Sequence, residues 1–261
     1  MEKRIQSIQR AINILNCYNE EYPNLSLSQI SEQLDLNINT VRGIVNTLEA
    51  NGLLTHNASD NTYSLGLYFV LKSNLIYETR HLESFAEITT PYLQEISTKY
   101  STFSSVQVVS QSNIFMIKTM QPPSSYYRIM AQLYSSLPYH CTSSGKLYLQ
   151  YLSKDNLKSA LANMNFEQYT PNTISNREEL MDELQKQKER LYSLEKDERT
   201  IGISSIAAPI LHSNRRLIGT ISVTAPTQSI LDQQEDIARD LIHAGKDIAM
   251  KVLDGSIAVT V

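Results

Sequence analysis

Apolar residues recur at helical spacing three times in the first fifty positions of the chain. The spacing predicts a first helix that ends before Pro23, a second helix over 27–35 and a third helix over 38–51. The inward stripe of the third helix consists of Val41, Ile44, Val45 and Leu48. Two short helices joined by a tight turn predict a helix-turn-helix, in which the second helix presents its outer face to a partner.

The ends of these helices carry residues that helix ends favour. Ser26 and Gln29 form a capping-box pattern before the second helix, and Asn37 is the expected cap of the third. Gly52 stands where a helix ends in the left-handed conformation. Two short strand patterns then flank the polar tip at 56–61, which predicts a β-wing.

The next segment, 67–77, is apolar on nearly all sides. A lone surface helix has a single apolar stripe, so this pattern predicts a linker helix that packs against a second helix.

Helical and strand patterns alternate beyond position 81 and predict a mixed α and β domain. Helices are expected over 85–100, 144–151, 157–164, 177–191 and near the C-terminus, and strands over 103–109, 114–120, 204–211 and 217–223. The final helix carries the stripe Ile237, Leu241, Ile248 and Val252. The charged run 177–199 alternates both signs, so we interpret it as a solvated helix face rather than an acidic interaction tail.

Composition and charge change this picture only locally. The net charge is -4, and acidic residues outnumber basic ones in the first 66 positions, so DNA affinity has to come from a local arrangement rather than from bulk charge. The two cysteines, Cys17 and Cys141, form no CxxC pair, and the five histidines lack a regular ligand spacing. We therefore expect no disulfide, metal or cofactor. No signal peptide or membrane span is apparent, which favours a cytoplasmic location.

The outer face of the third helix carries side chains of the types that read bases. Asparagine can pair with adenine and arginine with guanine, each through two hydrogen bonds, while Ile38 or the Thr40 methyl group suits a thymine methyl. The alternative is that Asn39, Thr40 and Asn46 are only solvated helix surface. The predicted DNA-binding residues are Ser28, Ile38, Asn39, Thr40, Arg42, Gly43 and Asn46.

The sequence resembles the IclR family of bacterial transcription regulators over nearly its whole length. The motifs that carry the resemblance are RAINIL at 10–15, LSLSQI at 25–30, TV at 40–41, YSLG at 63–66, LPYHCTSSGK at 137–146, YTPNTI at 169–174, SIAAPI at 205–210 and GTISV at 219–223. The resemblance implies an α+β chain with a winged helix-turn-helix at 1–66, a dimerising linker helix at 67–80, and a GAF-like α/β effector domain with an antiparallel sheet at 81–254. It also implies a small, usually carboxylated, effector.

Position in those motifs implies the effector-binding residues, which are Ser143, Ser144, Glu195, Ser205, Ser222 and Thr224. A helix that begins at the two adjacent serines offers free amides to a carboxylate. The family often has smaller residues at both serines and cysteine at Ser205, so this site is richer in hydroxyl groups and suits a hydroxylated ligand such as a sugar acid. Gly43 stands where the family often has arginine, which leaves Arg42 as the strong cation of the recognition helix.

Two other classes of function remain open. One is a ligand-sensing adaptor that does not bind DNA. The other is a serine hydrolase, because Ser143 and Lys146 form an SxxK pattern and 59–61 reads Ser-Asp-Asn. In penicillin-recognising enzymes the triplet follows the SxxK pattern, whereas here it precedes it and no KTG follows, which disfavours an enzyme. We expect a regulator that binds a two-fold symmetric operator as a homodimer or as a tetramer. We also expect it to be a repressor, because the release of a block by a ligand is the simpler scheme.

Overall fold

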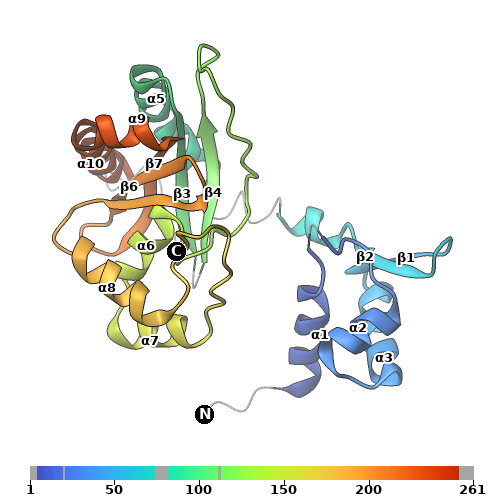
Figure 1. Cartoon of the computed structure of the whole chain (residues 1–261). Helices are drawn as coiled ribbons and strands as arrows, with labels where there is room; N and C mark the ends of the chain where they lie inside the picture. Colours follow the sequence, from blue (N-terminus) through green and yellow to red (C-terminus); the bar gives the residue numbers. More distant parts are fainter. Residues whose placement is uncertain (1–4, 20, 74–81, 111–112, 253–261) are drawn as a thin grey trace. The chain divides into compact units, whose positions relative to one another are not determined.

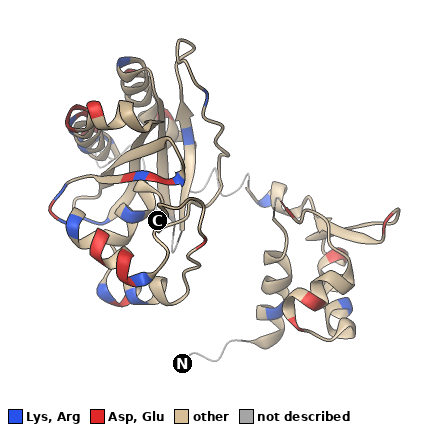
Figure 2. Cartoon of the chain, viewed as in Figure 1, with Lys and Arg blue, Asp and Glu red and all other residues tan. Residues whose placement is uncertain are grey.

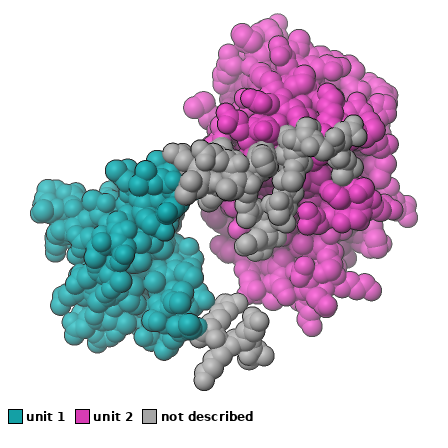
Figure 3. Space-filling view, turned by 180° about the vertical axis from the view of Figure 1, so that it is seen from behind, with its two compact units in different colours: residues 1–79 teal, residues 80–261 magenta. Residues whose placement is uncertain are grey.

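The computed structural model describes residues 5–19, 21–73, 82–110 and 113–252. The chain divides into two compact units, 1–79 and 80–261, which Figure 3 colours separately. The division falls within the segment 67–80 that the sequence suggested as a linker. Residues 68–73 of that segment are helical, and the remainder of the predicted linker helix lies outside the described residues.

Unit 1 contains the predicted helices and wing. They are α1 (Gln6–Asn16), α2 (Leu27–Leu34), α3 (Ile38–Ala50), β1 (Leu54–Asn57) and β2 (Thr62–Leu65) (Figure 1). The Ser26–Gln29 capping box is present in both directions, and the Asn37 side chain accepts from the Asn39 amide. The predicted stripe of α3 faces inward, because Val41, Val45 and Leu48 are buried in the core of the unit. The local sequence signals therefore located these elements correctly.

The wing is joined to the helices by close backbone contacts. Gly52 has φ +74°, as its predicted place at a helix end requires. The amide of Gly66 donates to the carbonyl of Leu53, and a Cβ atom built on Gly66 would lie 2.0 Å from the Gly52 carbonyl oxygen. Leu25, just before α2, pairs with Tyr63 of β2. The wing and the helices consequently form one small unit.

Unit 2 is built on an antiparallel sheet of five strands. The strands are β3 (Phe103–Ser110), β4 (Asn113–Met120), β5 (Ser193–Thr200), β6 (Ile203–Leu211) and β7 (Leu217–Pro226). Their order across the sheet is β4-β3-β7-β6-β5. The C-terminal strand β7 thus lies in the centre, between β3 and β6, and brings residues far apart in the sequence side by side.

Helices cover both faces of this sheet (Figure 1). Helices α5 (Leu82–Tyr100) and α10 (Gln234–Lys251) pack on one face, where the large apolar core includes Val106, Ile206 and Ile221. Helix α6 (Ser143–Gln150) packs on the opposite face of the central strands. Alternate residues of the strands face α6, and these are largely polar. The remaining helices are α7 (Lys154–Ala162), α8 (Arg177–Gln187) and α9 (Thr227–Asp232).

The interpretation of the charged run 177–199 as one solvated helix face is wrong. Helix α8 ends at Gln187, and the second half of the run forms strand β5 at the edge of the sheet. Glu195 and Glu198 of this strand are buried. Charged residues favour a helical assignment from sequence, but pairing of β5 with β6 decides the structure here. Among the described residues, no helix is long and apolar enough to cross a membrane.

Candidate functional sites

The first candidate site is the outer face of α3. Asn39, Arg42 and Asn46 are exposed there, Ile38 is 36% exposed, and Thr40 is half-buried at the first turn. The Arg42 guanidinium donates to Asn39 Oδ1 at 3.4 Å, so the two side chains that can read bases lie together. The remaining predicted residues of this face, Ser28 of α2 and Gly43, are also exposed.

The surroundings of this face supply little charge. Charged residues are sparse on unit 1 (Figure 2). A Cβ atom on Gly43 would meet nothing within 4 Å, so the chain leaves open space at that position of the recognition helix. At the wing, His56 Nε2 and Asn61 Oδ1 lie 2.9 Å apart, and the His56 ring packs against Tyr63. Apart from Arg42 and the asparagines, this face of α3 therefore offers few polar side chains of the base-reading types, and the described residues around it form no basic surface.

The second candidate site lies where α6 begins, on the polar face of the sheet. The Thr142 side chain caps the helix by accepting from the Gly145 amide. Ser143 Oγ lies 2.8 Å from Ser205 Oγ, and Ser205 in turn donates to Glu195 Oε2 at 3.0 Å. These three predicted effector residues come from α6, β6 and β5, are each at least nine-tenths buried, and form one continuous chain of hydrogen bonds.

Two other predicted residues meet in a neighbouring cluster around a glutamine that the sequence did not suggest. Gln107 Oε1 accepts from Ser144 Oγ at 3.0 Å and from Thr220 Oγ1 at 2.7 Å. Its amide nitrogen donates to Ser105 Oγ at 2.8 Å and to Ser222 Oγ at 3.2 Å. Gln107 thus connects the start of α6 to the central strands β3 and β7 through a buried, uncharged network.

Thr224 stands beside these clusters rather than inside them. It pairs with Ser205 in the β6–β7 register and lies on the same strand face as Ser222, two residues away. It is half-buried, and its side chain has no hydrogen bond among those of the described residues. The predicted set is therefore brought to one region, with Thr224 at its margin.

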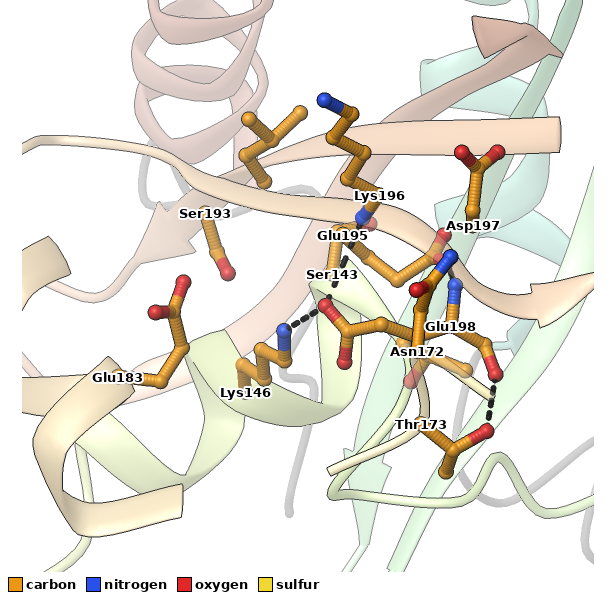
Figure 4. Close-up of polar contacts among 12 residues, drawn as sticks. Ser143, Lys146, Asn172, Thr173, Glu183, Ser193, Glu195, Lys196, Asp197 and Glu198 are labelled. Atoms are coloured by element: carbon orange, nitrogen blue, oxygen red, sulfur yellow. Dashed lines mark hydrogen bonds and ion pairs between the residues drawn. The ribbon is translucent and has the colours of Figure 1, made fainter. Parts of the chain in front are cut away.

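Charged groups lie directly beneath the first cluster (Figure 4). Lys146, one turn along α6 from Ser143, forms an ion pair with Glu198 Oε1 of β5, and its side chain is fully buried. Glu198 Oε2 is buried without a hydrogen-bond partner. Glu195 Oε1 accepts from the backbone amides of Glu198 and Arg199, at 2.6 and 3.2 Å. The region thus buries two carboxyl groups and one ammonium group.

Burial sets the protonation of these carboxyl groups. Loss of solvent raises the pKa of Glu195 from its ordinary value near 4.5 to about 7, although the two amides and Ser205 oppose the rise. Burial also raises the pKa of Glu198, and Lys146 opposes that rise. A buried charge needs an opposite charge nearby. When Glu195 carries a proton it is neutral, and the remaining charges of the site, on Lys146 and Glu198, balance each other.

Sequence reasoning missed Ser105, Gln107, Thr220, Lys146 and Glu198. The available signal was the period-two alternation of polar residues at 105, 107, 220, 222 and 224, which places them on one face of adjacent strands. The alternation does not show that a helix buries this face. Among the described residues, no cluster of three or more His, Cys, Asp or Glu side chains has the arrangement of a metal site.

Comparison with known proteins identifies the two units. Residues 7–58 match the IclR helix-turn-helix domain, and residues 80–250 match the bacterial transcriptional regulator IclR C-terminal domain. The chain belongs to the IclR family of bacterial transcription regulators. It is therefore a DNA-binding regulator with a C-terminal effector-binding domain, as the resemblance implied, and the expected fold class is confirmed.

Relatives of known name cover almost the whole IclR-family chain. The HTH-type transcriptional regulator XynR of Escherichia coli K12 is 25% identical over 234 residues, which are 88% of this chain and 90% of XynR. The HTH-type transcriptional repressor AllR of the same strain is 24% identical over 251 residues, or 93% and 91% of the two chains. An IclR homologue from Microbacterium hydrocarbonoxydans, solved with 4-hydroxybenzoate, has the same fold, with a TM-score of 0.67 at 17% identity over 94% of this chain and all of that one.

Proposed function

We propose that this IclR-family protein is a cytoplasmic homodimeric repressor with no catalytic activity, which leaves a two-fold symmetric operator when a small carboxylated effector binds. The outer face of α3 reads the operator, and the start of α6 with strands β5, β6 and β7 binds the effector. The repressor assignment is supported by the name of AllR, a transcriptional repressor, and the carboxylated effector by the 4-hydroxybenzoate bound to the Microbacterium homologue.

The buried hydroxyl chain at the start of α6 is the observation that carries the effector proposal. Buried polar groups are normally present because a structural or functional partner needs them. Here Ser143 lies in the first turn of α6, where backbone amides favour an anion, and its hydroxyl group reaches Ser205 and then Glu195. A carboxylate that displaces the Ser143–Ser205 hydrogen bond would receive a hydrogen bond from the Ser143 hydroxyl group, and it would also receive one from Ser205 once Ser205 turns away from Glu195.

The other end of the site favours hydrogen-bond donors on the effector. Glu195 Oε2 accepts from Ser205, and Glu198 Oε2 accepts from no described group. An effector that carries hydroxyl groups beside its carboxylate satisfies both ends, whereas a simple fatty acid leaves the carboxyl end without donors. A hydroxylated carboxylate such as a sugar acid is accordingly the effector class we propose.

The same contacts oppose a hydrolase that uses the SxxK pattern. In such an enzyme the lysine acts on the serine hydroxyl group, but Lys146 is engaged by Glu198, and the Ser143 hydroxyl group points to Ser205. Both side chains are buried. This arrangement supports a binding role for the pattern.

The decisive test is binding of the purified protein to the DNA upstream of its own gene, at stated salt and with excess non-specific DNA. We expect a specific complex, and we expect Arg42→Ala to lower its affinity by about tenfold or more, since one bidentate base contact contributes about 1–3 kcal/mol. Arg10→Ala, a change of another cation of unit 1 that lies on α1 rather than on α3, is the matched control. Undiminished binding and sequence preference in Arg42→Ala would refute the assignment of the recognition helix.

The effector is tested separately by thermal shift with paired ligands, such as gluconate against hexanoate, a carboxylate without hydroxyl groups. We expect the hydroxylated acid to stabilise the protein and to release the DNA, and Ser205→Ala to abolish both effects. If hexanoate stabilises the protein and gluconate does not, the hydroxylated class is wrong, while DNA binding remains independently tested.

A further inference from the structure

A hollow lies in the effector-binding unit, apart from the serine and glutamine clusters. Its volume is about 580 Å³, and its walls come from the start of β4, helix α6 and helix α7. This volume is within the range of small-molecule sites, about 300–1,000 Å³. None of the predicted effector residues lines it. It is therefore a separate place at which a small molecule can bind.

One wall is aromatic. Tyr139, before α6, and Tyr148 of α6 have ring centroids 5.1 Å apart and planes inclined by 34°. The Tyr139 hydroxyl group donates to Asn113 Oδ1 at 3.1 Å, which fixes the orientation of its ring. Burial raises the pKa of Tyr139 to about 12, so this phenol is uncharged at neutral pH. Tyr148 is only 4% exposed and belongs to the apolar core, so the half-buried Tyr139 supplies the ring surface of this wall, without adding charge.

The opposite wall is a polar face of α7. Asn156, Ser159 and Asn163 follow one another at spacings of three and four residues, so they share one helix face, and all three are exposed. The Asn163 amide nitrogen donates to the Ser159 carbonyl oxygen at 2.9 Å, and Asn163 Oδ1 has no hydrogen bond among those of the described residues. The side chains of Asn156 and Ser159 have no hydrogen bond among those of the described residues.

No charged side chain is among the described residues that line the hollow, although charged residues stand close by. Lys154, Asp155 and Lys158 are exposed on α7 but do not line it. A phosphate, carboxylate or amine would have to lose water at this position without gaining an opposite charge. The walls therefore disfavour ionic ligands.

We propose that the hollow between α6 and α7 binds a neutral polyhydroxylated molecule, namely a mono- or disaccharide. The Tyr139 ring covers the apolar C–H face of a sugar ring, and the amide and hydroxyl side chains of α7 both donate to and accept from its hydroxyl groups. A second hollow of about 250 Å³ shares Asn113, Tyr139 and Asn163 with the first and gives room for a second ring. Tyr148 belongs to the helix whose first turn carries Ser143, so a bound sugar contacts the element that holds the proposed effector site.

The proposal is tested with the full-length protein by saturation-transfer NMR and titration calorimetry. The probes are neutral sugars, namely glucose, xylose, maltose, cellobiose and xylobiose, each beside a charged counterpart where one exists, such as glucose 6-phosphate and glucosamine. We expect at least one neutral sugar to bind, and its charged counterpart to bind at least about tenfold more weakly.

Two variants on the same helix locate the binding. Ser159→Arg fills the hollow from an exposed position and keeps a good helix former, whereas Lys158→Ala changes a neighbouring residue outside it. We expect the first to weaken sugar binding at least about tenfold and the second to leave it unchanged. Ser205→Ala, in the proposed effector site, serves as a third variant and should also leave sugar binding unchanged.

Three results would overturn the proposal: no binding of any neutral sugar, binding that survives Ser159→Arg in full, or binding that is lost in Ser205→Ala. The last result would assign the sugar to the effector site instead. The first two outcomes leave DNA binding and the carboxylated effector untouched, because those are measured with DNA, with gluconate and with Arg42→Ala.

Discussion

Replacement of Glu195 by glutamine is expected to remove most of the pH dependence of the protein's free energy of unfolding. Glu195 is 3% exposed, and its pKa is raised from near 4.5 to about 7 in the folded protein. Between these two values the folded chain keeps the proton that the unfolded chain has released. The folded state then binds more protons than the unfolded state, so stability falls as pH rises through this window.

The size of the effect follows from the shift. A change of about 2.5 in pKa, at about 1.4 kcal/mol per unit, gives a loss of about 3 kcal/mol between pH 4.5 and 7, which persists at higher pH. Glutamine does not titrate, and its carbonyl oxygen can still accept from the amides of Glu198 and Arg199. We therefore expect Glu195→Gln to match the parent below pH 5 and to be more stable by about 2–3 kcal/mol at pH 8.

Calorimetric unfolding of the full-length protein from pH 5 to 8 measures this difference, at about 2–4 °C in Tm for each kcal/mol in a domain of this size. Glu189→Gln, a change of an exposed carboxylate just beyond α8, is the control and should leave the pH profile of the parent unaltered. Parallel profiles of Glu195→Gln and the parent would refute the reasoning, because they would mean that Glu195 carries no additional proton in the folded protein.

Three further substitutions test the packing and the buried polar groups, each by urea unfolding of the full-length protein. Gly66→Ala places a Cβ atom 2.0 Å from a backbone oxygen and should lower the free energy of unfolding of unit 1 by at least about 1–3 kcal/mol. Gly43→Ala, whose Cβ atom meets nothing within 4 Å, should be neutral or stabilising. Equal effects of the two changes would contradict the close approach at Gly66. Lys146→Met leaves the buried Glu198 unpaired and should lower the free energy of unfolding by about 3–5 kcal/mol. Adding Glu198→Gln should restore much of this loss. If it does not, the broken ion pair is not the cause of the lost stability. Gln107→Leu leaves the hydroxyl groups around it without their amide partner and should cost about 1–3 kcal/mol, and a neutral result would mean that water replaces the amide.

Local signals in the sequence were sufficient for the helix-turn-helix. Ser26, Asn37 and Gly52 act on the backbone within a few residues of themselves, so their type and position predicted where α2 and α3 begin and end. The cap of α6, by contrast, is Thr142, which the sequence analysis did not single out. The assignment of Ser28, Ile38, Asn39, Thr40, Arg42, Gly43 and Asn46 to DNA, and of the serines, Glu195 and Thr224 to an effector, stays a prediction until the variants are measured.

Strand β5 and the glutamine cluster could not be found in the same way, because both depend on distant partners. The charges of 193–200 favour solvent or helix locally, yet pairing with β6 buries Glu195 and Glu198. Alternating polar residues in a strand ordinarily indicate a face in water. Here α6 covers that face, so Gln107 is buried and takes four hydroxyl partners from three elements. Only the tertiary arrangement shows that these polar residues belong to an interior site.

Helix α6 contributes residues to the serine cluster, to the glutamine cluster and to the buried ion pair, so it connects the groups through which an effector can act. Its first turn supplies Ser143 and Ser144, and Lys146 ties it to the buried edge of β5. A Cβ atom on Gly145 would lie 2.6 Å from the Pro138 carbonyl oxygen, so the helix is held tightly against the preceding segment. An effector that replaces the Ser143–Ser205 contact must either fit this fixed helix or shift it. A ligand changes DNA affinity only by the difference in its binding free energy between two arrangements of the protein. Since α6 contacts β5, β6 and β7, a shift of this helix alters all of these contacts together.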